Sequence, residues 1–380
     1  MFDMNLVQRG ARLRRSPFFE ATQRHGAKAY TVYNHMLFPV GFDDLEAEYH
    51  HLLEHVTLWD VAVERQVEIT GPDAARFTDM LTSRDLTRCA VGQGKYVVIT
   101  AEDGGIINDP VLLRLGENHF WLALADSDVL LWARGVALNA GMKVKIEEPD
   151  VSPLQIQGPK AKDVVRALFG EPAMQLRYYH FLETKLDGIP VVVTRTGWTG
   201  EVGYEVYLRD GSRGDELWER IMAAGKPHGI RPTGPSDIRR IEAGILNWGA
   251  DMTAANNVYE VGLDHLVDEG KRADYIGRDA LRRIKAAGVR QKLVGIEIDG
   301  ERIEMNVVPW RVKSDGDTIG RVTSAVWSPR LRKNIGYAMV PPAQATPGTA
   351  LRVKIPGVGE RRATVVPKPF IDPNKDIPKS

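Results

Sequence analysis

The sequence has little cysteine and no long apolar run. Cys89 is the single cysteine among 380 residues, so the chain cannot form an internal disulfide or supply the clustered thiolates of a zinc or iron–sulfur site. No segment approaches the roughly 18 consecutive apolar residues that a membrane span needs, and the first residues lack the apolar stretch of a secretory signal. These absences predict a cytoplasmic protein without a membrane anchor.

The sequence also lacks an excess of charge of either sign. Fifty basic residues balance fifty acidic ones, so net charge attracts the chain neither to nucleic acid nor to an anionic membrane. A small polar ligand is therefore the expected partner. The first 30 residues carry four arginines between positions 9 and 15, and because acidic residues flank them we interpret this segment as a solvated arm rather than a transit peptide.

A supersecondary unit occurs twice along the chain. Gln66–Thr70 alternates like a half-buried strand and runs into Gly71-Pro72, while Leu154–Gln157 runs into Gly158-Pro159 in the same way. Each copy predicts a strand, a tight turn and a helix, with the proline in the first helical turn, where its missing N–H costs nothing.

Hairpin signals follow each copy of this unit. In the first, Lys95–Thr100 and Val111–Arg114 flank Asp103-Gly104-Gly105, a turn sequence typical of a hairpin. In the second, Val191–Thr194 and Tyr204–Leu208 form a comparable pair. We therefore predict an α+β protein with two pseudo-repeated antiparallel sheet and helix halves. A cleft between such halves is a usual place for a ligand.

The last quarter of the chain changes to short strands separated by glycine, proline and aspartate turns. Even spacing without intervening helices predicts a small C-terminal β-barrel, preceded by a joining helix over Asp274–Ala286 and followed by a poorly ordered tail, Pro367–Ser380. The predicted divisions are 1–30 for the arm, 31–150 and 151–286 for the two halves, 287–370 for the barrel and 371–380 for the tail. The predicted barrel strands are Leu293–Ile298, Thr318–Thr323, Asn334–Val340, Ala350–Ile355 and Arg362–Val366.

Asp109 is the first candidate for chemistry. It follows the Gly104-Gly105 turn and precedes Pro110, which removes a ladder donor where the backbone would otherwise pair. The pattern holds an acidic side chain at the rim of a strand. A turn-capping aspartate explains the spacing equally well, so both readings stay open on the sequence alone.

Glu205 and Tyr207 are the second candidate, together with Trp198 in the glycine-rich loop before them. The period of two places the acid and the phenol on one face of a strand, where burial is costly unless a ligand or partner uses them. A carboxylate can bind the adjacent N–H donors of a pterin ring with two charge-assisted hydrogen bonds. We interpret Glu205 as an unpaired carboxylate facing the cleft rather than as a core residue.

A third candidate lies in a helix that begins near Ser236 and carries two adjacent arginines. We expect one of the arginines, Arg239 or Arg240, to face inward beside Ile241. A solvated helical face is the alternative, and the residues alone favour it.

Together these segments resemble the aminomethyltransferase family, which comprises the glycine-cleavage T-protein and tetrahydrofolate-dependent demethylases. The resemblance runs nearly from end to end, and many ordered matches indicate membership more strongly than any single motif. The matching segments are Gly71–Ala74, Val91–Gln93, Gly104–Ile107, Gly158-Pro159, Thr196–Glu201, Ile241–Gly244, Asp274–Arg278, Thr323-Ser324 and Ser328-Pro329.

Within the family, the chain resembles the dimethylsulfoniopropionate demethylases. T-proteins tend to carry two aspartates where this chain has Asn108 and Asp109. In the other direction, Thr199-Gly200-Glu201 is similar to the T-protein pattern, which leaves the exact donor open. The segments that carry the demethylase resemblance are Lys28–Met36, Trp59–Val61, Glu64–Val67, Ile107–Pro110 and Ala125–Leu130.

The resemblance implies roles for seven residues, and it assigns none to His35. It implies a pterin held by Glu205, a catalytic Asp109 near the reacting nitrogen, further folate contacts from Tyr96, Trp198 and Arg240, and a substrate pocket formed by Tyr33, Trp198 and Tyr207.

The activity implied is transfer of a methyl group from a small sulfonium, such as dimethylsulfoniopropionate, to N5 of tetrahydrofolate. Because an onium leaving group departs neutral, no metal is required. Alternatives are a demethylase of betaines, N-methyl compounds or methoxy-aromatics, and a T-protein that works with a lipoyl carrier protein. A folate-binding relative in iron–sulfur assembly is a non-enzymatic alternative. The resemblance is also compatible with a homodimer.

Overall fold

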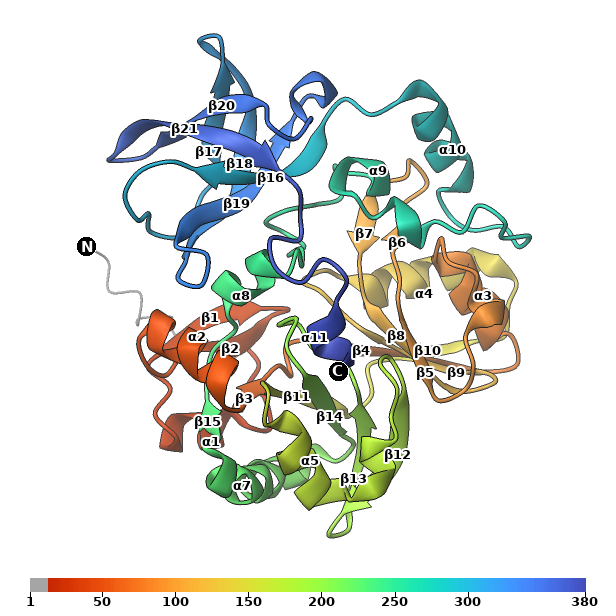
Figure 1. The fold of residues 1–380 in the computed structure, drawn as a ribbon. Helices are drawn as coiled ribbons and strands as arrows, with labels where there is room; N and C mark the ends of the chain where they lie inside the picture. Colours follow the sequence, from red (N-terminus) through yellow and green to blue (C-terminus); the bar gives the residue numbers. More distant parts are fainter. Residues whose placement is uncertain (1–12) are drawn as a thin grey trace.

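The computed structural model describes residues 13–380. Arg9 and Arg12 of the predicted arm lie outside the described residues. Three parts surround a shared centre (Figure 1): a five-stranded sheet, a six-stranded sheet and a closed barrel. The predicted α+β fold, with two sheet and helix halves and a C-terminal barrel, is confirmed.

The first sheet is wholly antiparallel. Its order is β10 (Lys145–Glu147), β4 (Gln66–Thr70), β9 (His119–Ala123), β8 (Val111–Gly116) and β5 (Gln93–Tyr96). The helices α3 (Ala74–Leu81) and α4 (Val129–Ala140) share a core with it. The alternation in β4 produces this packing, because Val67 and Ile69 point into that core.

The second sheet is antiparallel except at one edge. Its order is β12 (Phe181–Leu186), β13 (Ile189–Thr194), β14 (Gly203–Leu208), β11 (Ser152–Gln157), β3 (Thr57–Asp60) and β15 (Arg231–Pro232). Only β15 and β3 pair in parallel within it. The helices α5 (Ala161–Phe169) and α7 (Gly214–Gly225) contribute to its core. Although β3 comes early in the chain, it belongs to this second sheet.

The repeated unit forms as predicted, with one correction. Gly71 and Gly158 both adopt positive φ angles, +116° and +120°, and a Cβ at Gly71 would lie 2.7 Å from the carbonyl oxygen of Lys143. Only glycine fits such a turn without strain. The prediction that the prolines occupy the first helical turn is wrong. α3 begins at Ala74 and α5 at Ala161, so each proline lies in the turn before its helix.

The predicted hairpin around Gly104 is divided between two sheets. β5 pairs with β8, whereas β6 (Ile99–Thr100) and β7 (Ile106–Asn108) form a separate two-stranded sheet closer to the turn. The break falls at Asp109-Pro110, where proline has no N–H for the ladder. The break leaves Asp109 outside both ladders.

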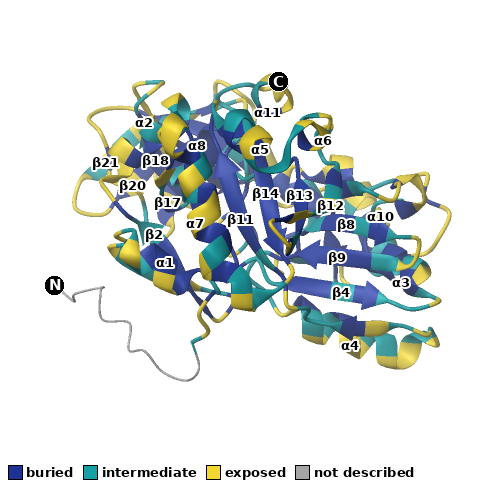
Figure 2. Ribbon diagram, turned by 90° about the horizontal axis from the view of Figure 1, so that it is seen from below, coloured by how far each residue is buried: buried dark blue, intermediate teal, exposed yellow. Residues whose placement is uncertain are grey.

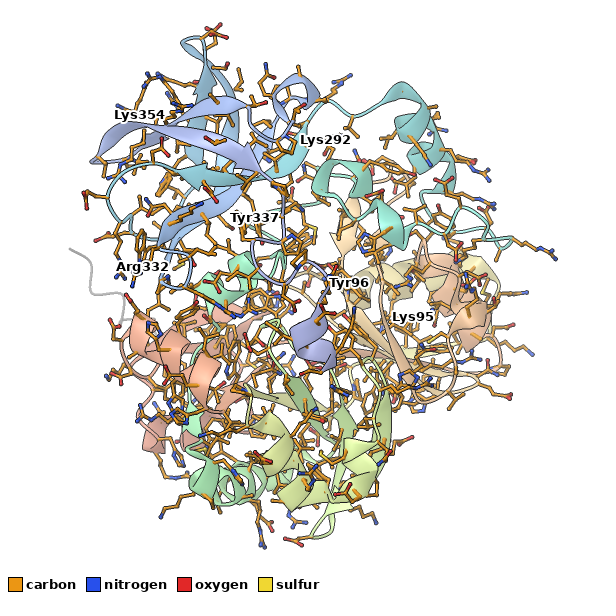
Figure 3. All side chains as sticks on the ribbon, viewed as in Figure 1. Lys95, Tyr96, Lys292, Arg332, Tyr337 and Lys354 are labelled. Carbon is orange, nitrogen blue, oxygen red and sulfur yellow. The ribbon has the colours of Figure 1, made fainter. Side chains whose placement is uncertain are left out.

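The C-terminal part is a closed barrel of six strands, β16-β19-β18-β17-β20-β21. All five predicted strands are present, and β17 was missed. Figure 3 shows Tyr337 near the base of the barrel and Lys354 at its outer end. The strands are β16 (Lys292–Ile298), β17 (Trp310–Ser314), β18 (Asp317–Ser328), β19 (Lys333–Val340), β20 (Ala350–Ile355) and β21 (Gly359–Val366), preceded by α10 (Arg278–Ala287).

Two contacts fix the three parts relative to one another. The sheets share a core in which Trp121 and Tyr207 are fully buried. Figure 2 shows the central strands β9, β11 and β14 as buried and the outer faces of the surrounding helices as exposed. α8 (Asp237–Glu242) packs on the barrel, where the hydroxyl of Tyr337 donates to the carbonyl of Ile241 over 2.9 Å.

Short elements complete the fold. They are α1 (Phe19–Arg24), β1 (Ala29–Tyr33), β2 (Met36–Gly41), α2 (Leu45–Glu54), α6 (Glu171–Met174), α9 (Val258–Val261) and α11 (Asp376–Lys379). Among residues 13–380, no helix has the length and apolar character needed to cross a membrane.

The C-terminal tail is held in place, contrary to the prediction of poor order. The backbone N–H groups of Phe370 and Ile371 donate to the carbonyl of Glu242 over 3.0 and 2.9 Å. α11 follows, and a guanidinium N–H of Arg195 donates to the carbonyl of Ser380. The tail therefore runs from the barrel across the centre of the molecule to the second sheet (Figure 1).

Candidate functional site

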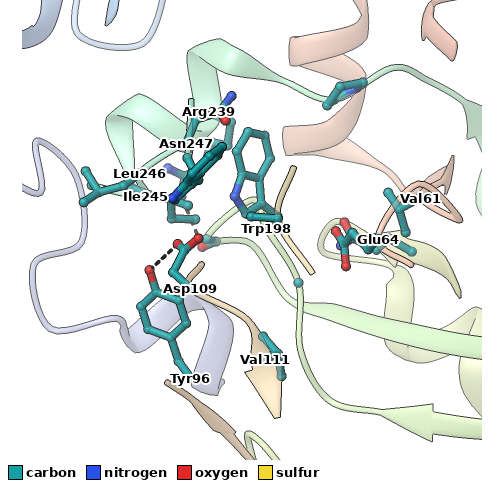
Figure 4. Close-up of a pocket in the computed structure, with 18 of the residues that line it drawn as sticks. Val61, Glu64, Tyr96, Asp109, Val111, Trp198, Arg239, Ile245, Leu246 and Asn247 are labelled. Atoms are coloured by element: carbon teal, nitrogen blue, oxygen red, sulfur yellow. Dashed lines mark hydrogen bonds between the residues drawn. The ribbon is translucent and has the colours of Figure 1, made fainter. Parts of the chain in front are cut away.

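A cavity of ≈ 490 Å³ lies at the centre of the molecule, between the two sheets and beside α8. Its size is in the range of pockets that hold small molecules and cofactors. Both sheets, α8 and the C-terminal tail contribute to its walls (Figure 4). The polar, charged and aromatic residues of its wall that are candidate ligand contacts include Tyr33, Glu64, Tyr96, Asp109, Gln155, Tyr178, Tyr179, Trp198, Arg239 and Trp248.

Asp109 is positioned by the break in the hairpin and by Tyr96. The hydroxyl of Tyr96 donates to Asp109 Oδ2 over 2.7 Å, and the bond is drawn in Figure 4. Asp109 Oδ1 is buried and has no hydrogen-bond partner. Burial raises the pKa of Asp109 to about 7, although the Tyr96 bond works in the opposite direction. The site thus presents an acceptor atom that nothing in the described chain satisfies.

Glu64 is a second carboxylate in the wall, in the turn between β3 and β4. It points into the cavity in Figure 4. Burial, together with the nearby Glu205 and Asp109, raises its pKa well above the ordinary value. Sequence reasoning assigned it no role, although it lies in the Glu64–Val67 segment that carried the demethylase resemblance.

Aromatic side chains form much of the remaining wall. Trp198 lies in the cavity wall, as the sequence predicted, and the guanidinium carbon of Arg240 is 5.6 Å from its ring centroid. Tyr33 also lies there, and its hydroxyl accepts from the backbone N–H of Asp126 over 3.0 Å. Tyr178 and Tyr179 were missed, although the two adjacent tyrosines could have indicated an aromatic wall.

Glu205 and Tyr207 lie behind the wall rather than in it. The interpretation of Glu205 as an unpaired carboxylate is wrong, because Tyr207, Thr196 and Gln155 donate to it over 2.7, 2.8 and 2.9 Å. Tyr207 is fully buried in the core between the sheets. Gln155 is the member of this network that reaches the cavity, and its Oε1 atom is buried without a partner.

Both arginines of α8 are buried, so the solvated-face alternative is wrong. Arg240 pairs with Asp237 at 2.5 Å and with Asp251 at 2.9 Å, which directs it toward the junction with the barrel. Arg239, not Arg240, belongs to the cavity wall, and it pairs with Glu201 at 2.7 Å. The sequence could not separate the two arginines because each has one isoleucine and the other arginine as its neighbours.

The tail forms the wall opposite the sheets. Pro369, Lys375 and Pro378 all line the cavity, and Pro369 packs against Gly244, where the positive φ of +73° suits glycine. Lys368 also lines it, and its ammonium donates to the carbonyl of Val261 over 3.3 Å. Burial lowers the pKa of both tail lysines.

The structure thus brings together Tyr33, Tyr96, Asp109 and Trp198 around one cavity, as predicted. Glu205, Tyr207 and Arg240 lie outside its wall, so their predicted contacts with ligands remain predictions. His35 is exposed, at a positive φ of +61°.

Comparison with known proteins identifies the family of this fold and site. Residues 18–271 match the GCVT N-terminal domain, and residues 291–372 match the glycine cleavage T-protein C-terminal barrel domain. The chain therefore belongs to the glycine-cleavage T-protein (aminomethyltransferase) family, as its motifs predicted.

Individual relatives span nearly the whole chain. Dimethylsulfoniopropionate demethylase DmdA of Ruegeria pomeroyi is 41% identical over 354 residues, which cover 93% of this chain and 96% of the relative. The aminomethyltransferase of Shouchella clausii is 33% identical over 364 residues, covering 94% and 98%. The solved structure of aminomethyltransferase T from Bartonella henselae shares the fold, with a TM-score of 0.85, 24% identity, and coverage of 94% and 98%.

Proposed function

We propose that the protein is a tetrahydrofolate-dependent demethylase. It transfers a methyl group from a small sulfonium, with dimethylsulfoniopropionate as the first candidate, to N5 of tetrahydrofolate and so forms 5-methyltetrahydrofolate. The 41% identity to the demethylase named above supports this choice over other donors. The observation that carries it is Asp109, whose Oδ1 is an unsatisfied acceptor in an aromatic cavity.

The cavity wall suits a folate. Tetrahydrofolate supplies a nucleophilic nitrogen, N5, and a planar amino-pyrimidinone ring with adjacent N–H donors. Asp109 Oδ1 and Gln155 Oε1 are both buried without partners, and such atoms are costly to leave unsatisfied. We propose that they accept hydrogen bonds from the bound folate, that Glu205 orients Gln155, and that Trp198 stacks on the ring.

The chain's own residues contribute positioning and electrostatics to the reaction. Holding the donor methyl in line with the nitrogen contributes on the order of 7–11 kcal/mol in favourable cases. The lone pair of N5 forms the new bond to the methyl carbon while the bond from that carbon to sulfur breaks, so the sulfide leaves neutral and the positive charge passes to the nitrogen. The nitrogen then loses its proton to solvent. Asp109 faces this charge and stabilises it. Each aromatic face against the cationic donor adds roughly 0.5–2 kcal/mol.

A donor panel with product analysis tests the proposal. The enzyme is incubated with tetrahydrofolate and sulfonium, betaine or methoxy-aromatic donors, and the folate is analysed by mass spectrometry. We expect methyl-tetrahydrofolate with the sulfonium. If no donor produced it, the proposal would be wrong, and the donor with the highest turnover decides among the demethylase alternatives.

A glycine-cleavage aminomethyltransferase is the second candidate. Relatives of that name, from Shouchella clausii and from Caldanaerobacter subterraneus subsp. tengcongensis, are 33% and 31% identical and cover 94% and 95% of the chain. This activity would yield methylene-tetrahydrofolate and ammonia from a lipoyl-bound aminomethyl group. The same mass measurement distinguishes the two candidates, because methylene and methyl products differ in mass.

A further inference from the structure

Glu64 is a wall residue whose carboxylate has no ion-pair or hydrogen-bond partner among residues 13–380. It occupies the turn between β3 and β4 and is partly exposed to the cavity. A buried carboxylate with a structural role normally accepts several hydrogen bonds. Glu242 illustrates that case, since Tyr49 and Ser328 donate to it over 2.8 and 2.5 Å. Glu64 differs because its oxygens face open volume.

The charges around Glu64 are all of one sign. Its neighbours Asp109 and Glu205 are acids, and Tyr33 and Tyr207 lie near enough to be affected by its charge. Among residues 13–380, no basic side chain forms an ion pair with Glu64, Asp109 or Glu205.

Three basic groups near Glu64 in the sequence or in the cavity wall are engaged elsewhere. Arg65 pairs with Glu148, Arg239 pairs with Glu201, and Lys368 donates to a backbone carbonyl. Lys375 also lines the cavity, but it is not among the groups whose charge acts on Glu64. This end of the cavity therefore gathers three acidic groups without a counter-ion, which is one reason why the pKa of Glu64 is raised. A ligand with a fixed positive charge would supply one, and in a desolvated pocket that attraction is stronger than in water.

We propose that Glu64 is the counter-ion of the donor's cationic centre and that it makes the enzyme selective for onium donors over neutral ones of the same shape. The inference rests on the proposed function and specifies the donor class that this cavity accepts. Tyr33 and Trp198 provide aromatic faces for the same cation. Glu64 is thus a binding residue, and Asp109 stays the residue beside the reacting nitrogen.

The test measures binding without turnover. Dimethylsulfoniopropionate and 4-methylpentanoate have nearly the same shape and share a carboxylate, but the second has a neutral carbon in place of the sulfonium. Calorimetric titration without folate gives a Kd for each. We expect the wild type to prefer the sulfonium, and Glu64→Gln to reduce that preference on the order of ten- to a hundred-fold, as loss of a desolvated charge partner does.

Two further variants serve as controls. Glu64→Asp retains the charge and should preserve most of the preference. Glu68→Gln changes a half-buried carboxylate on the adjacent strand, where Trp121 donates to it over 2.8 Å outside the cavity, and it should leave the preference unchanged. Thermal unfolding of each variant establishes whether it is folded. If Glu64→Gln does not fold, the ratio of the two Kd values in the wild type and in Glu64→Asp tests the proposal.

The outcomes separate this inference from the proposed function. Equal affinity of the wild type for both compounds, or an unaltered ratio in Glu64→Gln, would overturn the role of Glu64 even if methyl transfer proceeds normally. A charge preference that depends on Glu64, in an enzyme that yields no methyl-tetrahydrofolate, would support the cation site and overturn the demethylase proposal.

Discussion

The hydroxyl of Tyr96 donates to Asp109 Oδ2 over 2.7 Å and leaves Oδ1 without a partner. One oxygen is thus anchored, and the other is buried at the cavity wall without a partner. The arrangement fixes the carboxylate before any ligand binds, which is the condition under which electrostatic stabilisation of a transition state is most effective.

Asp109→Asn should lower turnover while retaining ligand binding. Asparagine keeps the size and the acceptor but removes the charge that faces the developing cation, so we expect kcat to fall about 10²–10³-fold with KM nearly unchanged. Asp103→Asn is the matched control, because Asp103 accepts from the N–H of Gly105 in the adjacent turn. Wild-type turnover by Asp109→Asn with both substrates saturating would show that the residue only shapes the turn.

Tyr96→Phe should shift the acidic limb of the profile of kcat/KM against pH to higher pH. The pKa of Asp109 is about 7 because of burial, and the hydrogen bond from Tyr96 lowers it. If ionised Asp109 is the active form, kcat/KM falls as pH drops through about 7. Removal of the hydroxyl raises the pKa, so the same loss begins at higher pH. A profile of kcat/KM against pH for both enzymes measures the shift. An unmoved limb would mean that another group controls it.

Glu205→Ala should destabilise the fold as well as alter folate binding. The sequence suggested an unpaired carboxylate, but Tyr207, Thr196 and Gln155 all donate to it. Each buried donor left unsatisfied costs about 1–3 kcal/mol, so the midpoint of thermal unfolding should fall. Glu205→Gln retains an acceptor and should be less affected. Equal midpoints for Glu205→Ala and wild type would contradict the network.

Deletion of residues 373–380 should weaken donor binding more than it lowers stability. The deletion removes α11 with the wall residues Lys375 and Pro378, but it leaves the barrel and both sheets intact. We expect the Kd for the donor to rise on the order of ten-fold, equivalent to about 1.4 kcal/mol. Titration and thermal unfolding of the shortened chain provide the comparison. A large fall in the unfolding midpoint with unchanged affinity would assign the tail a structural role.

Sequence patterns predicted many helices, strands and turns correctly, because these elements are determined largely by residues that are close together in the chain. The alternation of Gln66–Thr70 and the turn at Gly71 can each be recognised from a few consecutive residues, and both appear as expected. β17 was missed although Trp310 and Val312 alternate with Arg311 and Lys313, because five residues with two apolar positions are a short signal.

The site was harder to predict because it depends on which faces of the strands and helices pack against one another in the tertiary structure. The period of two correctly placed Glu205 and Tyr207 on one face of β14, yet it could not show that this face packs against the first sheet. Glu64 and the tail lie far apart in sequence, and the tertiary fold places both in the wall of one cavity. No single-sequence pattern indicates such a shared wall, since a turn glutamate and a polar tail are both ordinary surface features.

The position of the tail at the end of the described chain also determines when the cavity wall is completed during synthesis. Of the described segments that line the cavity, residues 368–378 leave the ribosome last, after both sheets and the barrel have been synthesised. The remaining walls can therefore fold before the cavity is closed on that side. Any group fused beyond Ser380 emerges beside Arg195 at the second sheet, so a purification tag is better attached at the opposite end of the chain.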